Sequence, residues 1–108
     1  MNTEEVFDKL GDNFHAGVIK ETRTYYFHIG DVMRTVTVKP DSFIVEKGKT
    51  IEKADCVGKT SEEFFMKIWN EGYMPQLKDL ISGAIKSNNP SALKEFLEAF
   101  HGKSEAKL

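Results

Sequence analysis

The chain has 108 residues, of which 40% are hydrophobic and 30% are charged, and its formal net charge is −2 at pH 7. This composition is typical of a globular protein, so we expect residues 1–108 to form a single domain with its own core. The balance of lysines and acids lacks the basic excess of a nucleic-acid-binding protein, and Cys56, the only cysteine, leaves no internal disulfide.

A short helix is predicted first, followed by strands. Asn2 with Glu5 has capping-box spacing, which predicts a helix over residues 2–10. The residue types then change to Thr, Tyr, Phe and Ile, which favour a half-buried strand, and this strand is predicted over residues 18–29. Because side chains alternate along a strand, its apolar face is expected to carry Tyr25, Phe27 and Ile29.

Further strands are predicted as a meander. The pair Gly30-Asp31 is a two-residue hairpin signal, so the chain is expected to return over residues 32–38. A turn at Pro40 precedes a strand over residues 43–46, and a fourth strand is predicted over residues 54–58. Because the connections are short, neighbouring strands are expected to be antiparallel.

Helical periodicity begins at Thr60, which has capping-box spacing with Glu63. Gly72 is expected to end this first helix, and Pro75 suits the first position of the next one. That helix is expected to end at Gly83. A short strand over residues 84–86 and a last helix capped by Asn89-Pro90 complete the pattern. The apolar stripes of these helices, which alone indicate a plain core, are Phe64, Phe65, Ile68 and Trp69, then Leu77, Leu80 and Ile81, then Leu93, Phe96, Leu97 and Phe100.

No catalytic or metal-binding constellation is visible in the sequence. The histidines, His15, His28 and His101, stand far apart and have no second ligand at metal spacing. Cys56 is predicted to be a small buried thiol, since no base can be assigned to it. The glycines stand singly, so there is no phosphate-binding loop. We therefore expect a binding protein without a cofactor or metal, rather than an enzyme.

The series of short motifs in the second half of the chain is more specific than its apolar helical stripes. In chain order it consists of Ala54-Asp55, Ser61-Glu62-Glu63-Phe64, Gly72, Pro75, Ser82-Gly83, Ile85-Lys86 and the apolar run from Leu93 to Phe100. Together with Tyr25-Tyr26-Phe27 and Val36-Thr37-Val38 upstream, this order resembles the sterol carrier protein-2-like family of lipid-transfer domains. The chain departs from the family at Ser87-Asn88-Asn89-Pro90, where a Gly-Asp pair is common.

The resemblance implies an α+β fold, with an about five-stranded, mostly antiparallel sheet covered on one face by helices. It also implies non-catalytic binding or transfer of a fatty acid, an acyl-CoA or a sterol-like molecule in a tunnel between sheet and helices. The side chains expected to line that tunnel are Phe64, Ile68, Trp69, Leu77, Leu80, Ile81, Leu93, Phe96, Leu97 and Phe100. The alternative is a protein-interaction or dimerisation module with a filled core and no ligand. A monomer and a homodimer both remain open.

The sequence also bears on location. It contains no apolar run long enough to span a bilayer and no signal-peptide pattern, so we expect a cytoplasmic protein with at most transient membrane contact. Residues 103–108 are expected to be a frayed tail. The last three residues, Ala-Lys-Leu, resemble the Ser-Lys-Leu peroxisomal address, which has a meaning only in a eukaryotic protein.

Overall fold

The computed structural model describes residues 2–100. The predictions for His101, for the tail over residues 103–108 and for the terminal Ala-Lys-Leu lie outside this range. No helix within residues 2–100 combines the length and the apolar character needed to cross a membrane.

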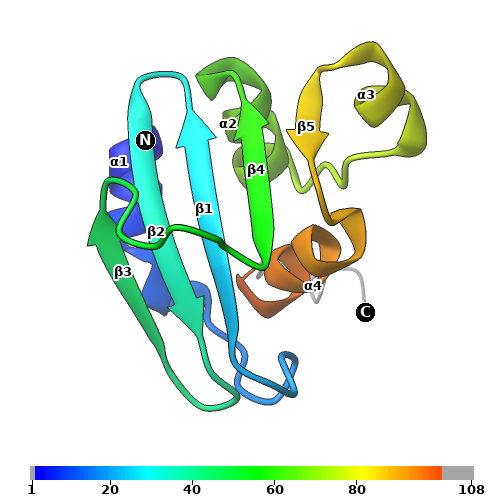
Figure 1. Ribbon diagram of the computed structural model, residues 1–108. Helices are drawn as coiled ribbons and strands as arrows, with labels where there is room; N and C mark the ends of the chain where they lie inside the picture. The colour runs from blue at the N-terminus through cyan, green and yellow to red at the C-terminus, as the bar shows by residue number, and fades with distance from the viewer. Residues whose placement is uncertain (1, 101–108) are drawn as a thin grey trace.

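A five-stranded sheet forms the centre of the fold (Figure 1). Its strands are β1 (Arg23–Ile29), β2 (Val32–Val38), β3 (Phe43–Lys47), β4 (Cys56–Thr60) and β5 (Ile85–Ser87), in the spatial order β3-β2-β1-β4-β5. The pairs β1–β2, β2–β3 and β4–β5 are antiparallel, and β1–β4 is parallel. The predicted mostly antiparallel five-stranded sheet is therefore confirmed.

The expected position of the fourth strand is wrong, because β4 pairs with β1 rather than with β3. Residues 48–55 cross the helix-free face of the sheet to reach that position (Figure 1). The crossing is held by the Thr35 hydroxyl, which donates to the Gly48 carbonyl at 2.8 Å and accepts from the Thr50 amide at 3.0 Å. At its end, an Asp55 oxygen accepts the Thr24 amide at 2.9 Å. This crossover lets β4 run parallel to β1.

Several element bounds differ from the predictions by a few residues. β1 begins at Arg23, because the chain is turned over residues 16–22, where Ile19 is nevertheless buried in the core. β4 runs two residues beyond the predicted end, to Thr60. The Gly30-Asp31 hairpin and the strand over residues 32–38 are confirmed.

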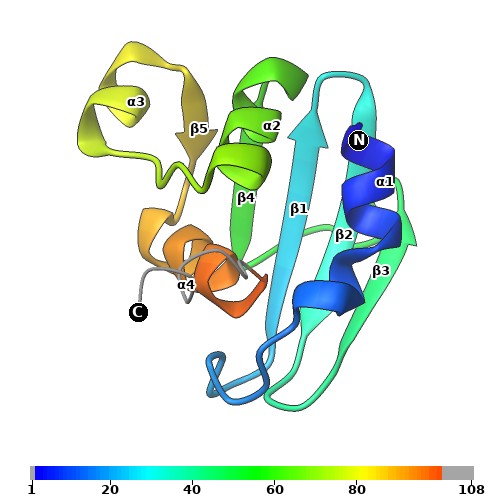
Figure 2. The ribbon, with the colours of Figure 1, turned by 180° about the vertical axis from the view of Figure 1, so that it is seen from behind.

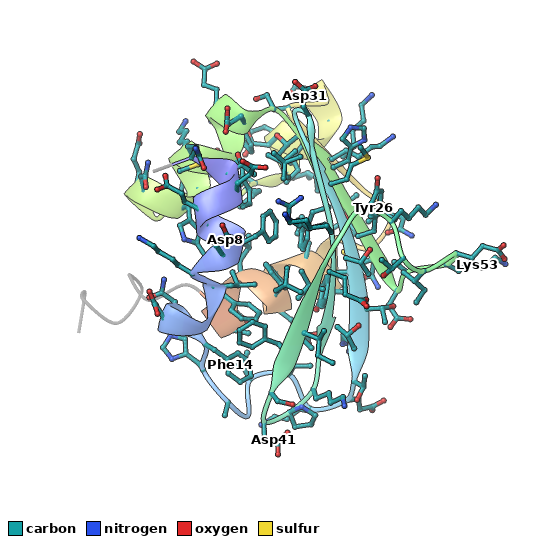
Figure 3. The ribbon with its side chains drawn as sticks, turned by 90° about the vertical axis from the view of Figure 1, so that its left-hand side faces the viewer. Asp8, Phe14, Tyr26, Asp31, Asp41 and Lys53 are labelled. Atoms are coloured by element: carbon teal, nitrogen blue, oxygen red, sulfur yellow. The ribbon has the colours of Figure 1, made fainter. Side chains whose placement is uncertain are left out.

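The helices cover one face of the sheet, as predicted (Figure 2). Those on this face are α1 (Thr3–Asp8), the 3-10 turn η1 (Leu10–Asn13), α2 (Glu62–Glu71) and α4 (Pro90–Phe100). The short helix α3 (Leu77–Ser82) lies beside β5, at one edge of the sheet. Figure 3 shows the layers edge-on, with Asp8 and Phe14 on the helical side of the sheet and Tyr26 and Lys53 on the other.

Local hydrogen bonds explain where the helices begin. The predicted capping box of α1 is present, since Asn2 Oδ1 accepts the Glu5 amide at 2.9 Å and Glu5 accepts the Asn2 amide at 2.9 Å. Helix α2 is capped by Ser61 rather than by Thr60, because Thr60 is the last residue of β4 and its hydroxyl donates to the Ala84 carbonyl at 2.7 Å. Helix α3 begins at Leu77, so the prediction that Pro75 is its first residue is wrong.

Candidate functional site

An apolar groove lies between α3 and α4 and has a volume of about 260 Å³. We call it the α3–α4 groove. The segment between α2 and α3 forms one wall, α3 continues it, and the first two turns of α4 form the other. Most of its lining is apolar, and the lining residues are Met74, Pro75, Gln76, Leu77, Leu80, Pro90, Ser91, Leu93, Lys94 and Leu97.

The first wall is held in place by Asp79. Its Oδ2 accepts the Tyr73 hydroxyl at 2.6 Å and the Gln76 amide at 2.8 Å. These two hydrogen bonds, the Tyr73 bond first, lower the pKa of the Asp79 carboxyl. The Lys67 ammonium lies 4.3 Å from the centre of the Tyr73 ring, which is a cation–π distance. Because Gly72 ends α2 in the left-handed conformation at φ 72, the chain turns sharply into this wall.

The second wall, α4, is anchored to the sheet at its first turn. The side-chain oxygen of Asn89 accepts the Ala92 amide at 3.2 Å, and its amide nitrogen donates to the Asp55 carbonyl at 3.3 Å. The Tyr25 hydroxyl rises from β1 and donates to the Ala92 carbonyl at 3.0 Å. Burial raises the pKa of the Tyr25 phenol, so this donor keeps its proton. The start of α4 is therefore fixed over β1 and β4.

The layer beneath the groove is packed with aromatic rings. The Phe96 ring lies 4.9 Å from that of Tyr25, 4.7 Å from that of Phe27 and 4.7 Å from that of Phe100, centre to centre. A Cβ placed on Gly58 in β4 would lie 3.1 Å from the Phe27 ring, so any larger residue would require this ring to shift by a few tenths of an ångström. The interior between sheet and helices is therefore largely solid.

A small void lies in this layer, with a volume of about 10 Å³. A cavity of that size is at the lower limit for a single water molecule. Its lining includes Leu93 and Leu97, which also line the α3–α4 groove. These two side chains therefore separate the groove from the interior.

The structure divides the side chains predicted to line a tunnel into three groups. Buried in the core are Ile68, Leu93, Phe96, Leu97 and Phe100. Partly buried against the core are Phe64, Trp69 and Leu80. Leu77 and Ile81 are 71% and 77% exposed. Four members of the set line the α3–α4 groove, namely Leu77, Leu80, Leu93 and Leu97.

Sequence reasoning missed the part of the groove that lies outside the helical stripes. Met74, Pro75 and Gln76 form a wall without regular structure, and Pro90, Ser91 and Lys94 complete the opposite side. The signal that could have found this part of the groove is the pair Pro75 and Pro90, because proline is common near the start of a helix and these two residues lie at or just before the starts of α3 and α4.

Cys56, the only cysteine, is buried, and the described residues hold no cluster of metal-ligating side chains. Within residues 2–100, no group of three or more His, Cys, Asp or Glu side chains is placed to hold a metal ion. The Cys56 sulfur lies 3.6 Å from the Ser87 hydroxyl and 3.5 Å from the Asn89 carbonyl. Burial raises the pKa of the Cys56 thiol, which disfavours the reactive thiolate.

Comparison with known proteins relies on structure, because the sequence matches no family model and no curated protein. The fold is similar to part of the stereoselective inverting sec-alkylsulfatase Pisa1 from Pseudomonas sp., with a TM-score of 0.77 and 16% identity over 94% of this chain. The chain spans only 16% of the length of that sulfatase.

Smaller proteins share the fold over most of their length. Palmitated SCP2L2 from Aedes aegypti matches with a TM-score of 0.57 and 16% identity, covering 94% of this chain and 97% of that one. The ubiquinone synthesis protein UbiJ-SCP2 matches with a TM-score of 0.57 and 14% identity, covering 96% of this chain and 79% of that one. The α+β fold of residues 2–100 is therefore that of a sterol carrier protein-2-like domain, in agreement with the order of motifs in the sequence.

Proposed function

We propose that this protein binds a lipid with an apolar chain in the α3–α4 groove and acts as a carrier rather than as an enzyme. The observation that carries the proposal is the groove itself, an open space of about 260 Å³ whose lining is mostly apolar. Ligand pockets commonly have volumes of roughly 300–1,000 Å³, so the groove suits one short chain or one end of a longer chain. The similar fold of palmitated SCP2L2 supports a fatty acyl ligand.

The energetics favour an alkyl chain over a polar ligand. Each methylene removed from water contributes about 0.8 kcal/mol, so eight methylenes contribute roughly 6 kcal/mol before the entropy cost of binding. The polar lining residues, Gln76, Ser91 and Lys94, provide hydrogen-bond donors beside this apolar surface. The positive charge of Lys94 favours a ligand whose head group is a carboxylate. A fatty acid fits these groups better than an uncharged sterol.

The direct test is uptake of a fluorescent fatty acid, together with native mass spectrometry of the purified protein. Leu77→Asp is the informative variant, because Leu77 lines the groove and is 71% exposed, so folding tolerates the change. We expect it to weaken binding by about tenfold or more, since it replaces an apolar contact with a charge.

A matched control comes from the same helix. Ile81 is 77% exposed and is absent from the groove lining, so Ile81→Asp is expected to leave the affinity unchanged. A wild-type protein that carries no lipid and takes up no fatty acid would contradict the proposal. Equal losses of fatty acid affinity in Leu77→Asp and Ile81→Asp would show that α3 contributes only general hydrophobicity and no specific groove contact.

A second candidate function is that of an interaction or dimerisation module. Two observations favour it. A similar fold makes up only 16% of a larger enzyme, the sulfatase, as an accessory module would. In addition, α3 exposes the apolar side chains of Leu77 and Ile81. Light scattering after size-exclusion chromatography tests self-association. A dimer that both Leu77→Asp and Ile81→Asp convert into a monomer would favour this candidate, whereas a monomeric wild type that binds lipid would favour the carrier.

A further inference from the structure

A second hollow lies at the opposite end of the domain, between α1–η1 and the strands β2 and β3. Its volume is about 460 Å³. We call it the Arg34 hollow, and its lining residues are Phe7, Asp8, Lys9, Gly11, Asp12, Arg34, Phe43, Val45 and Lys47. Asp8, on the helical side of the sheet in Figure 3, marks its position. None of these residues lines the α3–α4 groove.

The Arg34 side chain is buried, with only 8% of its surface exposed. A buried guanidinium is costly unless its N–H groups find acceptors. Within residues 2–100 it has one hydrogen bond, in which Nη1 donates to the neighbouring Met33 carbonyl at 2.8 Å. Its one ion pair joins Nη2 to Glu4 Oε2 at 3.6 Å, and the Glu4 side chain is 63% exposed. That distance is too long for a good hydrogen bond, so donor capacity is left over.

The register of the sheet adds a second positive charge. Arg34 in β2 lies directly opposite Lys47 in β3, and both side chains line the hollow. Like charges directly opposite each other across two strands destabilise a sheet, and a negative group between them removes this repulsion. Lys9 at the end of α1 adds a third cation. Asp8 and Asp12 offset two of these charges, and the exposed Glu4 pairs with Arg34 at 3.6 Å.

The remaining lining is apolar. Phe7 comes from α1, and Phe43 and Val45 come from β3, so both the helix and the strand contribute apolar side chains to the hollow that Arg34 lines. A charged head group alone would leave these surfaces in contact with water. A ligand that carries both an anionic group and a short apolar body would cover them.

We propose that the Arg34 hollow binds a small anionic amphiphile, namely a carboxylate joined to a short alkyl or aryl group. Arg34 contacts the carboxylate and replaces its weak pair with Glu4, while Phe7, Phe43 and Val45 contact the apolar body. The planar guanidinium suits a carboxylate because it can donate two parallel hydrogen bonds to it. This site is separate from the α3–α4 groove and does not depend on the function proposed for that groove.

The test is a titration of the ¹⁵N-labelled full chain with hexanoate, followed by amide chemical shifts. We expect shifts at residues 8–12, at Arg34 and along β3. Hexanol, which has the same chain without a charge, and acetate, which has the charge without a chain, are expected to bind at least about tenfold more weakly, as each lacks one of the two contributions. Shifts confined to residues 74–80 and 90–97 would overturn the proposal, as would equal binding of hexanol or of acetate.

Two substitutions separate binding from folding. Arg34→Gln removes the cation and is expected to weaken hexanoate binding by about tenfold or more. Glu4→Gln removes the competing carboxylate at an exposed position and is expected to strengthen hexanoate binding several-fold. If Arg34 had only a structural role, Glu4→Gln would not strengthen hexanoate binding. This variant therefore tests the proposal even if Arg34→Gln fails to fold. Lys53→Gln, on the helix-free face and outside the linings of both the hollow and the α3–α4 groove, is the control and is expected to bind hexanoate as the wild type does.

Discussion

The two halves of the helical layer cover the sheet in different ways. Over β1 and β2 the helices meet the sheet through aromatic rings, and Phe96 contacts Tyr25, Phe27 and Phe100 at ring-centre distances of 4.7–4.9 Å. At the β5 edge, α3 has only six residues and leaves Leu77 and Ile81 more than two-thirds exposed. The aromatic half is therefore closely packed, whereas the groove lies in the half where apolar side chains of α3 remain exposed.

The contrast shows how one apolar composition can give both a core and a binding surface. A long helix such as α4 buries its whole stripe, because its eleven residues reach across the sheet. A helix of under two turns cannot cover its neighbour, so apolar side chains at its edge remain available to a ligand or a partner. Substitutions in the two halves are therefore expected to separate stability from binding.

The largest effect is expected for Phe96→Ala. Phe96 is 1% exposed and touches three other rings, so its removal leaves a cavity in the aromatic part of the core. We expect a loss of about 3–5 kcal/mol in the free energy of unfolding, measured by urea denaturation. Ile44→Ala, on the helix-free face where Ile44 is 51% exposed, serves as control and is expected to change stability by at most about 0.5 kcal/mol. Equal losses in both variants would contradict the assignment of a solid core.

A smaller effect on stability, with a change in the preferred chain length of the ligand, is expected for Leu97→Ala. Leu97 is 3% exposed and separates the groove from the small void. We expect a cost of about 2–5 kcal/mol and a shift of ligand preference toward longer acyl chains, measured by competition within a series of fatty acids. Leu10→Ala, at an equally buried position that lines neither space, should cost similar stability without changing the preferred chain length. An unchanged preference in Leu97→Ala would show that the interior does not receive the chain.

Local signals in the sequence predicted the local structure well. Alternation placed Tyr25, Phe27 and Ile29 on one buried face, and Gly30-Asp31 formed the predicted hairpin, because both depend on residues close in the chain. The partner of β4 could not be read in this way. It depends on a crossing of the helix-free face that Thr35 holds from 13 residues away, which no short-range pattern reveals.

The candidate site was only partly predictable for the same reason. The helical stripes identified Leu77, Leu80, Leu93 and Leu97, all of which line the groove. The stripes could not separate these side chains from Phe96 and Phe100, since an apolar side chain has the same periodicity whether it faces a core or a groove. The Arg34 hollow gave no signal, because it combines α1 with a strand far along the chain.

The smallest expected effect concerns the wall of the groove and depends on pH. The hydrogen bonds from Tyr73 and Gln76 lower the pKa of Asp79 in the folded state below its ordinary value of about 4. Their contribution to stability is therefore complete above that value and is lost as the pH falls through the lowered pKa of the folded state. Asp79→Asn is expected to be less stable than the wild type at pH 7, and the difference should shrink as the pH falls below about 4.

Thermal unfolding of both proteins from pH 7 to pH 3 measures this convergence, and fatty acid uptake over the same range shows whether the groove follows. Tyr73→Phe is the matched variant, because it removes the Tyr73 hydrogen bond and leaves the carboxylate and the Gln76 bond in place. It should therefore have a weaker version of the same pH dependence. A stability difference between wild type and Asp79→Asn that stays constant with pH would show that the ionised carboxylate does not hold the wall. The groove would then depend on packing alone, as the aromatic half of the layer does.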